Sequence, residues 1–370
     1  MDIEQIIKEL KEARKKDPFF SGGRIVSSVS TEPLRVALEA FRIFSDVNAL
    51  DTYIFPSVIG LEREVIEWLG TMLKNPKAAG YITTGGTESN IQALYAAKKL
   101  YPQRKELIVP KSAHYSIYKA ADLMGLRIKW TRVDGNFRAD TLSIKKALGK
   151  DTLAVVATAG TAALGMVDPL EEINELCPDV FLHVDAAFGG FVLPFTGKRR
   201  MDFGLMNLDS VTIDPHKMGM TPIPAGSILF RDGSYLEKLA CTPSYLPVET
   251  YTLCGSRSGG AIAASWAVLK SLGLEGYKKI VDGCMKNTAY LCSELEKIPG
   301  ASLATEPDLN IVGIKIPDLE KNSRELGRRG WKLAVNTDAG CIRFVVMPHV
   351  TIEVIDDFMQ ELKKIIKNKG

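Results

Sequence analysis

Two charged residues follow apolar strand-like runs in the middle of the chain and suggest its chemistry. The run 181–184 ends at Asp185, and the run 210–213 is followed four residues later by Lys217. Residues that follow parallel strands meet at the carboxyl edge of an open sheet, where ligands bind. A lysine amine can bond covalently to a carbonyl group, and a buried carboxylate can keep a ring nitrogen protonated. An ordinary ion pair between Lys217 and Asp185 is the alternative interpretation.

A glycine turn upstream favours the catalytic interpretation. Residues 84–90, Thr-Gly-Gly-Thr-Glu-Ser-Asn, lie between a short apolar strand and a helical pattern. Gly85 and Gly86 allow the backbone to approach a ligand closely, and Thr87 is expected to cap the helix. Free amides at a helix N-terminus bind phosphate. A nucleophilic lysine, a carboxylate and a phosphate site together predict that the chain binds pyridoxal 5′-phosphate.

Four motifs in this order resemble the group II pyridoxal-phosphate-dependent amino-acid decarboxylases, and most closely the archaeal L-tyrosine/L-aspartate decarboxylases. The motifs lie at residues 84–90, 112–116, 183–190 and 209–217. Residues 222–230 and 342–349 extend the same resemblance to the C-terminal part of the chain. A second likeness, carried by residues 20–23 and 255–266, is to sphingosine-phosphate lyase, which cleaves a carbon–carbon bond.

The resemblance implies a role for each residue that matches a motif of the family. Lys217 would bond covalently to the cofactor, and Asp185 would pair with its ring nitrogen. Ala187 and His114 would pack against the two faces of the ring. The remaining cofactor contacts are expected from Gly85, Gly86, Thr87, Thr161, His216 and Ser256. Ser256 would reach the site across a subunit interface, so a homodimer with shared active sites is expected.

The substrate contacts are expected to come from other parts of the chain. Arg343 lies in an apolar strand, where a charged side chain needs a partner. Arginine binds carboxylates with two hydrogen bonds, and the resemblance implies that Arg343 holds the substrate's α-carboxylate. An ion pair between domains is the alternative. Tyr245 is expected to contact the substrate, and Tyr245, Tyr251 and His114 are candidates for returning a proton to the α-carbon. His183 is expected to be structural, and the role of His349 is left open.

The resemblance implies α-decarboxylation of an L-amino acid, from L-tyrosine to tyramine or from L-aspartate to β-alanine. These products imply a place in methanofuran or coenzyme A biosynthesis. Residues 48–57 depart from the Gly-Asp-Pro-Gly stretch that is usual in the archaeal decarboxylases, so the choice of substrate stays open. A carbon–carbon lyase, an aminotransferase and a non-catalytic cofactor-binding protein are the alternatives.

The composition of the 370-residue chain argues against several other classes of function. A net charge of +3 gives no reason to expect nucleic acid or a membrane as a partner. The apolar stretches are only strand-length, so no transmembrane helix is expected. Residues 1–10 predict an amphipathic helix without the apolar region of a signal peptide, so a cytoplasmic location is expected. The six scattered cysteines lack metal-ligand spacing, and no metal site is expected.

The elements that must position these residues alternate between strand and helix. Seven strands are expected, at residues 79–83, 106–109, 127–133, 153–157, 180–185, 210–213 and 227–230. With helices between most of them, this alternation predicts an α/β architecture with a mostly parallel sheet. The last two strands are expected to be antiparallel, because the connection 218–226 is too short for a helical crossover.

Three segments are expected along the chain. They are a helical segment at residues 1–50, a large cofactor-binding domain at 51–275 and a small C-terminal α+β domain at 276–370. Two helices, at 260–272 and 276–297, are expected where the large domain passes into the small one. This organisation corresponds to fold type I of the pyridoxal-phosphate enzymes, the aspartate aminotransferase-like fold, which the resemblance also implies.

Overall fold

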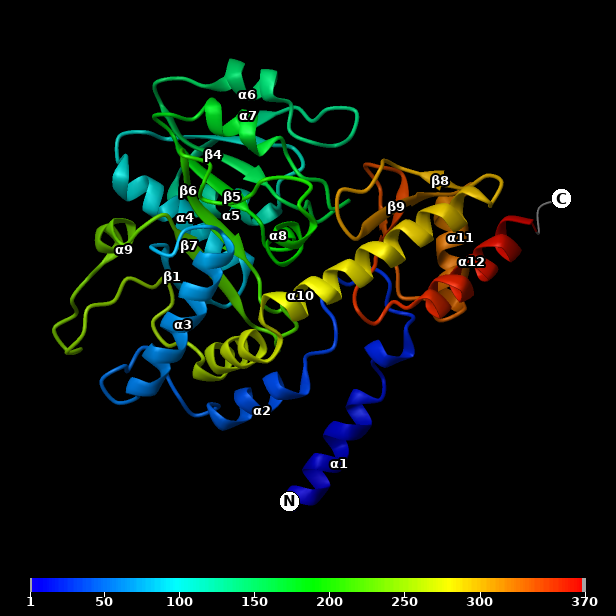
Figure 1. Cartoon of the computed structure of the whole chain (residues 1–370), viewed down its shortest axis with the longest axis horizontal. Coiled ribbons are helices and arrows are strands. Elements are labelled where there is room, and N and C mark those ends of the chain that lie inside the picture. The colour runs from blue at the N-terminus through cyan, green and yellow to red at the C-terminus, as the bar shows by residue number, and fades with distance from the viewer. Residues whose placement is uncertain (1, 368–370) are drawn as a thin grey trace.

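Two β-sheets organise residues 2–367, the part of the chain that the computed structural model describes (Figure 1). The larger sheet has the strand order β1-β7-β6-β5-β4-β2-β3. Its strands are β1 (Ala79–Thr83), β2 (Glu106–Pro110), β3 (Arg127–Thr131), β4 (Thr152–Thr158), β5 (Phe181–Asp185), β6 (Leu208–Ile213) and β7 (Gly226–Phe230). All seven predicted strands are present. Strand β7 pairs antiparallel with β1 and β6, as predicted for the last two strands, and the other neighbours are parallel.

The alternation of side chains along the strands builds a hydrophobic core on each face of this sheet. On β4, Val155 and Ala157 belong to one core, whereas Ala154 and Val156 belong to the other. Successive residues of a strand point to opposite faces. A strand that is buried on both faces must therefore be apolar throughout, which explains the continuous apolar run at 153–157.

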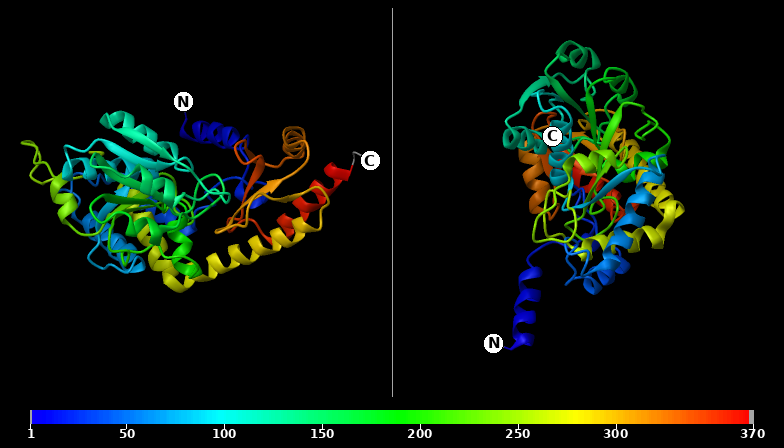
Figure 2. Two further views of the ribbon diagram at one scale, coloured as in Figure 1. Left: turned by 90° about the horizontal axis from the view of Figure 1, so that it is seen from above. Right: turned by 90° about the vertical axis from the view of Figure 1, so that its left-hand side faces the viewer.

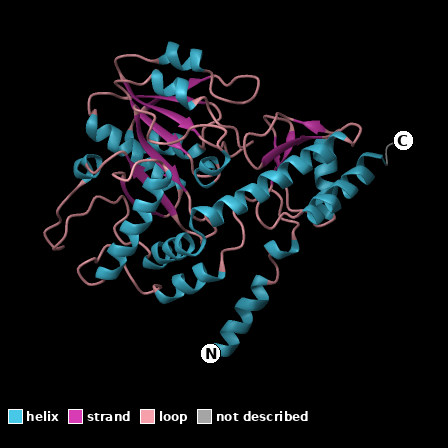
Figure 3. Ribbon diagram, viewed as in Figure 1, coloured by secondary structure: helices cyan, strands magenta, loops and turns pink. Residues whose placement is uncertain are grey.

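Helices cover both faces of the larger sheet (Figure 3). One face packs against α4 (Gly86–Leu100), α5 (Tyr115–Met124) and α9 (Ser234–Leu239). The other face packs against α3 (Pro56–Met72), α6 (Thr141–Ala147), α7 (Leu170–Glu175), α8 (Leu193–Thr196) and the first part of α10 (Gly259–Glu296). The result is a three-layered α/β arrangement in which the carboxyl ends of the parallel strands lie at one edge.

The long element α10 connects the two sheets (Figure 2). The sequence predicts two helices here, and the structure contains a break at the expected place. Gly273 has φ +57° and ψ −174°, a conformation that interrupts the helix and separates 259–272 from 274–296. The chain continues helically on both sides of this kink. The predicted domain boundary at 275/276 therefore falls within one nearly continuous element.

The smaller sheet is antiparallel and has the strand order β10-β11-β9-β8. Its strands are β8 (Ser302–Leu303), β9 (Ile311–Lys315), β10 (Ala334–Asn336) and β11 (Cys341–Val345). The end of α10, α11 (Leu319–Arg328) and α12 (Ile352–Lys367) pack around it. Strand β11 is the apolar strand in which the sequence predicts Arg343 to lie. Strands β8 and β10 are only two and three residues long, too short to show a period of their own.

The N-terminal part contains α1 (Ile3–Arg14), a 3₁₀ turn (Phe20–Gly22) and α2 (Arg35–Ile43). Helix α1 buries none of its side chains and extends away from the rest of the chain (Figure 2). The segment that follows reaches the smaller sheet, where the carbonyl of Val26 accepts a hydrogen bond from the amide of Val345. Within residues 2–367, no helix combines the length and the apolar character needed to cross a bilayer.

Candidate active site

A cavity of about 390 Å³ lies at the carboxyl ends of the central strands of the larger sheet. This is the edge at which open α/β sheets bind their ligands. The cavity brings together most of the site residues that the sequence predicts, namely Gly85, Gly86, Thr87, His114, Asp185, Ala187, His216, Lys217 and Arg343. Arg343 comes from the smaller sheet, so the cavity lies where the two sheets approach each other.

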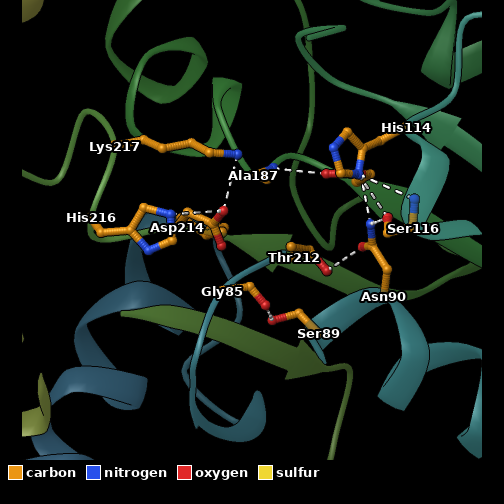
Figure 4. A network of polar contacts seen from close by, with 12 residues as sticks. Gly85, Ser89, Asn90, His114, Ser116, Ala187, Thr212, Asp214, His216 and Lys217 are labelled. Carbon is orange, nitrogen blue, oxygen red and sulfur yellow. Dashed lines mark hydrogen bonds and ion pairs between the residues drawn. The ribbon is translucent and has the colours of Figure 1, made fainter. Parts of the chain in front are cut away.

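Lys217 forms its ion pair with Asp214 and not with Asp185 (Figure 4). The distance between Lys217 Nζ and Asp214 Oδ2 is 3.0 Å. Asp214 is almost fully buried, and its Oδ1 has no hydrogen-bond partner among the described residues. The alternative interpretation of Lys217 and Asp185 as an ordinary ion pair is therefore wrong. Both residues line the same cavity, but Lys217 pairs with Asp214, whereas Asp185 accepts a hydrogen bond from Asn90.

Asp185 ends β5, and its carboxylate accepts two hydrogen bonds. Its Oδ2 accepts from Asn90 Nδ2 at 2.7 Å, and its Oδ1 accepts from the amide of Ala187 at 3.0 Å. The side chain is 5% exposed, so the donors replace the water that burial removes. Asp185 thus presents a carboxylate of fixed orientation to the cavity.

The glycine turn forms the N-terminus of α4 beside this carboxylate. Gly85 is the N-cap residue, with φ +152°, so the prediction that Thr87 caps the helix is wrong. The positive φ requires a residue without a side chain at the cap. Glu88 stabilises the turn instead, because its Oε2 accepts hydrogen bonds from the amide of Thr84 at 2.8 Å and from its hydroxyl at 2.7 Å.

Gly86 allows this helix terminus to lie against the ends of β5 and β6. A Cβ atom at Gly86 would lie 3.0 Å from Asp214 Oδ2 and 3.1 Å from Ala187 Cβ. His216 closes the other side of the turn, where its Cε1 would lie 3.0 Å from a Cβ at Gly85. Its Nδ1 accepts a hydrogen bond from the amide of Ala225 at 3.1 Å, and burial lowers the pKa of the imidazole. The turn is a cradle for an anionic group at the positive end of α4.

His114 lines the cavity from the N-cap position of α5. Its Nδ1 lies 2.9 Å from Ser116 Oγ and 3.3 Å from the amide nitrogen of Ser116. Burial lowers the pKa of His114, and this effect outweighs the opposite influence of the nearby Asp185. His114 is therefore held as a neutral imidazole at neutral pH.

Arg343 projects into the cavity from β11. Its guanidinium donates hydrogen bonds to the carbonyl of Ala162, at 2.8 Å, and to the carbonyl of Ser27. Its Nε is buried without a partner, and no carboxylate of residues 2–367 forms an ion pair with it. The alternative of an ion pair between domains is therefore wrong. Burial lowers the pKa of Arg343, yet a guanidinium stays charged at neutral pH, so the cavity contains a cation that forms no ion pair within residues 2–367.

Three predicted site residues do not line this cavity. Thr161 is buried next to it, where its Oγ1 accepts a hydrogen bond from the amide of Met166 at 3.0 Å. Ser256 lies exposed ahead of α10, and its hydroxyl accepts a hydrogen bond from Asn48 Nδ2 at 3.3 Å. Tyr245 is 81% exposed in the loop that follows α9. Their predicted contacts to cofactor and substrate stay predictions.

The remaining two histidines are His183, which is expected to be structural, and His349, whose role is left open. Each forms hydrogen bonds to neighbouring groups. His183 is buried in β5, with hydrogen bonds to Ser210 and Asn90, as expected for a structural residue. His349 joins the N-terminal segment to the end of the smaller sheet, where its Nε2 donates to the carbonyl of Ile25 at 2.8 Å. His349 does not line the cavity.

Comparison with known proteins identifies the family. The family model for the pyridoxal-dependent decarboxylase conserved domain matches residues 42–316. The chain belongs to this family. It is 41% identical over 374 residues to the L-aspartate/L-glutamate decarboxylase of Pyrococcus horikoshii, with 98% of this chain and 97% of that protein covered. It is 42% identical over 370 residues to the probable L-tyrosine/L-aspartate decarboxylase of Methanocella arvoryzae, with 98% of each covered.

A solved structure gives the same picture of the fold. The sphingosine-1-phosphate lyase of Burkholderia pseudomallei superposes with a TM-score of 0.92 at 26% identity, covering 99% of this chain and 91% of that chain. The predicted fold type I architecture and both predicted resemblances are therefore confirmed. The chain is a pyridoxal-dependent amino-acid decarboxylase.

The cavity of this decarboxylase fits pyridoxal 5′-phosphate. A side chain at Gly86 would press against Asp214 and Ala187, and the helix N-terminus at Gly85 and Gly86 offers free amides to a phosphate. Lys217 supplies an amine that lines the same cavity, and Asp185 supplies a carboxylate that suits a protonated ring nitrogen. Asp214 Oδ1 and Arg343 Nε are polar atoms that find no partner in the described part of the chain.

Sequence reasoning did not identify Asp214, Asn90 and Ser116 as parts of this site. Asp214 directly follows β6 and precedes Lys217 by three residues, so this spacing could have identified it as a partner of the lysine. Asn90 closes the glycine motif, and Ser116 closes the motif that contains His114. In the sequence, Asn90 lies 95 residues from its partner Asp185 and 26 residues from its partner Ser116. No local pattern indicates such pairs.

Proposed function

We propose that this decarboxylase removes the α-carboxyl group of L-aspartate, with L-tyrosine as the second candidate substrate. The observation that carries the proposal is the position of Arg343, whose guanidinium lines the same cavity as Lys217 without an acidic partner among the described residues. L-Aspartate comes first because it is named for both the Pyrococcus horikoshii and the Methanocella arvoryzae relatives, whereas L-tyrosine is named for the second alone.

In this proposal, each residue of the cavity has a separate task. Bound pyridoxal phosphate supplies a ring that accepts the electron pair of the bond that breaks. Lys217 carries the cofactor, and Asp185 keeps the ring nitrogen protonated. Arg343 binds the α-carboxylate and orients the bond to be broken. Orientation of this kind can supply about 7–11 kcal/mol of a barrier. Gly85, Gly86, Thr87 and His216 hold the phosphate.

A proton must also return to the α-carbon after carbon dioxide leaves. Of the three predicted donors, His114 lines the cavity, whereas Tyr245 and Tyr251 do not line the cavity of their own chain. We therefore propose His114 as the donor within one chain. A tyrosine from the loop of a second chain is the alternative, which the exposure of Tyr245 favours.

We also propose that the enzyme is a homodimer with shared active sites. Support comes from large apolar side chains that are exposed in the first 59 residues, namely Ile3, Ile6, Ile7, Leu10, Phe19, Val36, Leu38, Ile43, Tyr53, Ile54 and Ile59. Exposed apolar patches of this kind mark protein interfaces. Ser256 is exposed in the single chain and would then contact the phosphate of the neighbouring site.

Mixed dimers test the shared site. A dimer of one Lys217→Ala chain and one Ser256→Asp chain contains one intact site only if Ser256 serves the neighbouring chain. We expect such a mixture to recover up to about a quarter of the wild-type activity, because half of randomly paired dimers are mixed and each has one of two sites. No recovery in mixtures that are dimeric by light scattering would contradict the shared site.

The decarboxylation itself is tested by release of carbon dioxide from purified, cofactor-loaded protein. L-Aspartate, L-glutamate and L-tyrosine are offered in turn to the wild type, to Lys217→Ala and to Lys278→Ala, a control in an exposed lysine of α10. We expect release by the wild type and the control, and none by Lys217→Ala. A protein that binds the cofactor but releases no carbon dioxide would contradict the proposal.

Release of an aldehyde from a phosphorylated amino alcohol would then support the lyase alternative, and formation of a keto acid would support an aminotransferase.

The products suggest a cellular role that we add to the proposal. β-Alanine would feed coenzyme A biosynthesis, and tyramine would feed methanofuran biosynthesis, in the cytoplasm of an archaeal cell. Deletion of the gene should then make growth depend on the missing product. Rescue by β-alanine would support L-aspartate as the substrate, and rescue by tyramine alone would support L-tyrosine.

A further inference from the structure

Asn90 is a fully buried residue of α4 whose side-chain amide uses all of its hydrogen-bonding capacity (Figure 4). Its Nδ2 donates to Asp185 Oδ2 at 2.7 Å and to Ser116 Oγ at 2.8 Å. Its Oδ1 accepts from Thr212 Oγ1 at 2.8 Å and from His183 Nε2 at 2.9 Å. The amide therefore connects the end of β5, the start of α5 and the end of β6. A side chain that only filled space would not need four directed bonds.

The carboxylate of Asp185 fixes the orientation of this amide. An ionised carboxylate can only accept hydrogen bonds, so the Nδ2 group of Asn90 must face Asp185. The Oδ1 atom then faces His183, whose Nε2 must carry a hydrogen. The other ring nitrogen, His183 Nδ1, lies 2.8 Å from Ser210 Oγ and accepts from that hydroxyl. Burial lowers the pKa of His183 to about 4, which is consistent with a neutral ring in a single tautomer.

The same orientation extends through Ser116 to His114. Ser116 Oγ accepts from Asn90, so its own hydrogen is free to point to His114 Nδ1 at 2.9 Å. The backbone amide of Ser116 points to the same nitrogen at 3.3 Å. With two donors facing Nδ1, the neutral ring must carry its proton on Nε2. Nε2 has no hydrogen-bond partner within residues 2–367, and the ring lines the cavity.

We propose that Asn90 is a positioning residue of the decarboxylation site, which holds the Asp185 carboxylate and, through Ser116, presents the Nε2 proton of His114 to the cavity. This inference rests on the proposed function, in which Asp185 and His114 face the cofactor and the substrate. Without the amide, Asp185 loses a charge-assisted hydrogen bond, and the His114 ring loses the hydroxyl orientation that supports its tautomer beside the backbone amide of Ser116. The buried side chain of Asn90 thus sets the direction of the hydrogen bonds that reach both Asp185 and His114.

Nitrogen NMR of the cofactor-free protein tests this inference without any need for turnover. The chain has four histidines, so the ring signals of a ¹⁵N-histidine-labelled sample can be assigned by substitution. We expect the neutral Nε2–H tautomer for both His114 and His183 in the wild type. Ser116→Ala should shift the ring nitrogen signals of His114 alone, because Nδ1 keeps only the backbone donor, and Asn90→Ala should shift the signals of both rings. An Nδ1–H tautomer of His114 in the wild type, or unchanged nitrogen signals of both rings in Asn90→Ala, would overturn the proposal.

A matched control separates positioning from simple stabilisation. Asn322 in α11 is also buried, and its Nδ2 donates to the carbonyl of Pro317 at 2.6 Å, away from the cavity. Asn322→Ala should lower stability as Asn90→Ala does, but leave both tautomers and the activity unchanged. If Asn90→Ala does not fold, Ser116→Ala and Thr212→Val each remove a single hydroxyl of the network. Unchanged His114 signals in Ser116→Ala together with unchanged His183 signals in Thr212→Val would then overturn the proposal.

The loaded enzyme gives an independent measurement. A hydrogen bond to a charged group is worth enough to reduce kcat/KM by about 10- to 100-fold when it is lost. We expect this reduction in Asn90→Ala, together with a shift of the pH midpoint of the bound cofactor's absorbance. A change of less than about twofold in an active wild-type background would contradict the proposal. If the wild type itself releases no carbon dioxide, the proposed function fails, and the tautomers in the cofactor-free protein alone decide the role of Asn90.

Discussion

Lys217 lies three residues after Asp214, and its ammonium is 3.0 Å from the Asp214 carboxylate. Asp214 is the more buried of the two, with 1% of its side chain exposed compared with 20% for Lys217. The lysine therefore neutralises a carboxylate that water cannot reach. Because Asp214 Oδ1 has no hydrogen-bond partner in the described residues, the compensation depends on Lys217 more than on any other group.

Because Asp214 is more deeply buried than Lys217, substitutions of these two residues should have non-additive effects on the free energy of unfolding. In the cofactor-free protein, Lys217→Ala should lower the free energy of unfolding by about 3 kcal/mol, because it leaves a buried charge alone. The double variant Lys217→Ala/Asp214→Asn should recover at least half of that loss, because it removes the charge as well. Urea unfolding at pH 7 measures both values. A double variant that is less stable than Lys217→Ala would contradict the prediction.

Arg343→Lys tests the binding of the substrate's carboxylate. A lysine keeps the charge but lacks the two-pronged geometry of the guanidinium. We expect KM for the amino acid to rise about 10- to 100-fold, which corresponds to a loss of about 1.5–3 kcal/mol. Absorbance of the bound cofactor should be unchanged. Arg24→Lys is a suitable control, since Arg24 also donates to a backbone carbonyl but does not line the cavity. An unchanged KM in Arg343→Lys would contradict the assignment.

Gly86→Ala tests the cradle at the N-terminus of α4. The added Cβ would lie 3.0 Å from Asp214 Oδ2, closer than ordinary van der Waals contact. Overpacking of this kind costs about 1–3 kcal/mol, so we expect the Kd for pyridoxal phosphate to rise about 5- to 100-fold. Equilibrium dialysis measures it. Gly283→Ala is the control, because its Cβ would meet no atom within 4 Å and should slightly stabilise α10. Equal affinity in Gly86→Ala and the wild type would argue against a phosphate site here.

The buried His183 predicts a pH-dependent stability difference. The pKa of His183 is lowered to about 4 by burial, whereas an unfolded histidine titrates near 6.5. As the pH falls below 6.5, the unfolded chain binds a proton that the folded chain does not, so stability is lost. The stability advantage of the wild type over His183→Gln should therefore shrink by about 2–3 kcal/mol between pH 7 and pH 4.5. Urea unfolding at several pH values measures the difference, and a constant difference would contradict a titrating ring.

Most of the secondary structure around the site was predictable from the sequence. All seven strands of the larger sheet carry apolar runs of strand length, and the connection 218–226 was too short for a parallel crossover. The kink at Gly273 appears in the sequence as an interruption of the helical pattern. The cap of α4 was predicted wrongly, because the positive φ of Gly85 and the hydrogen bonds from Thr84 to Glu88 depend on the conformation of the turn.

The sequence by itself determined which groups are the candidates for the chemistry. Lys217, Asp185 and the glycine turn each belong to a local segment that follows a strand, and parallel strands bring their carboxyl ends to a common edge. Tertiary structure alone decided the partner of each group. Asn90 bonds to Asp185 and Thr212 across 95 and 122 residues, and Arg343 bonds to Ala162 across 181 residues. Such bonds depend on side-chain directions and on distances of a few ångströms between remote segments, which neither periodicity nor motif spacing encodes.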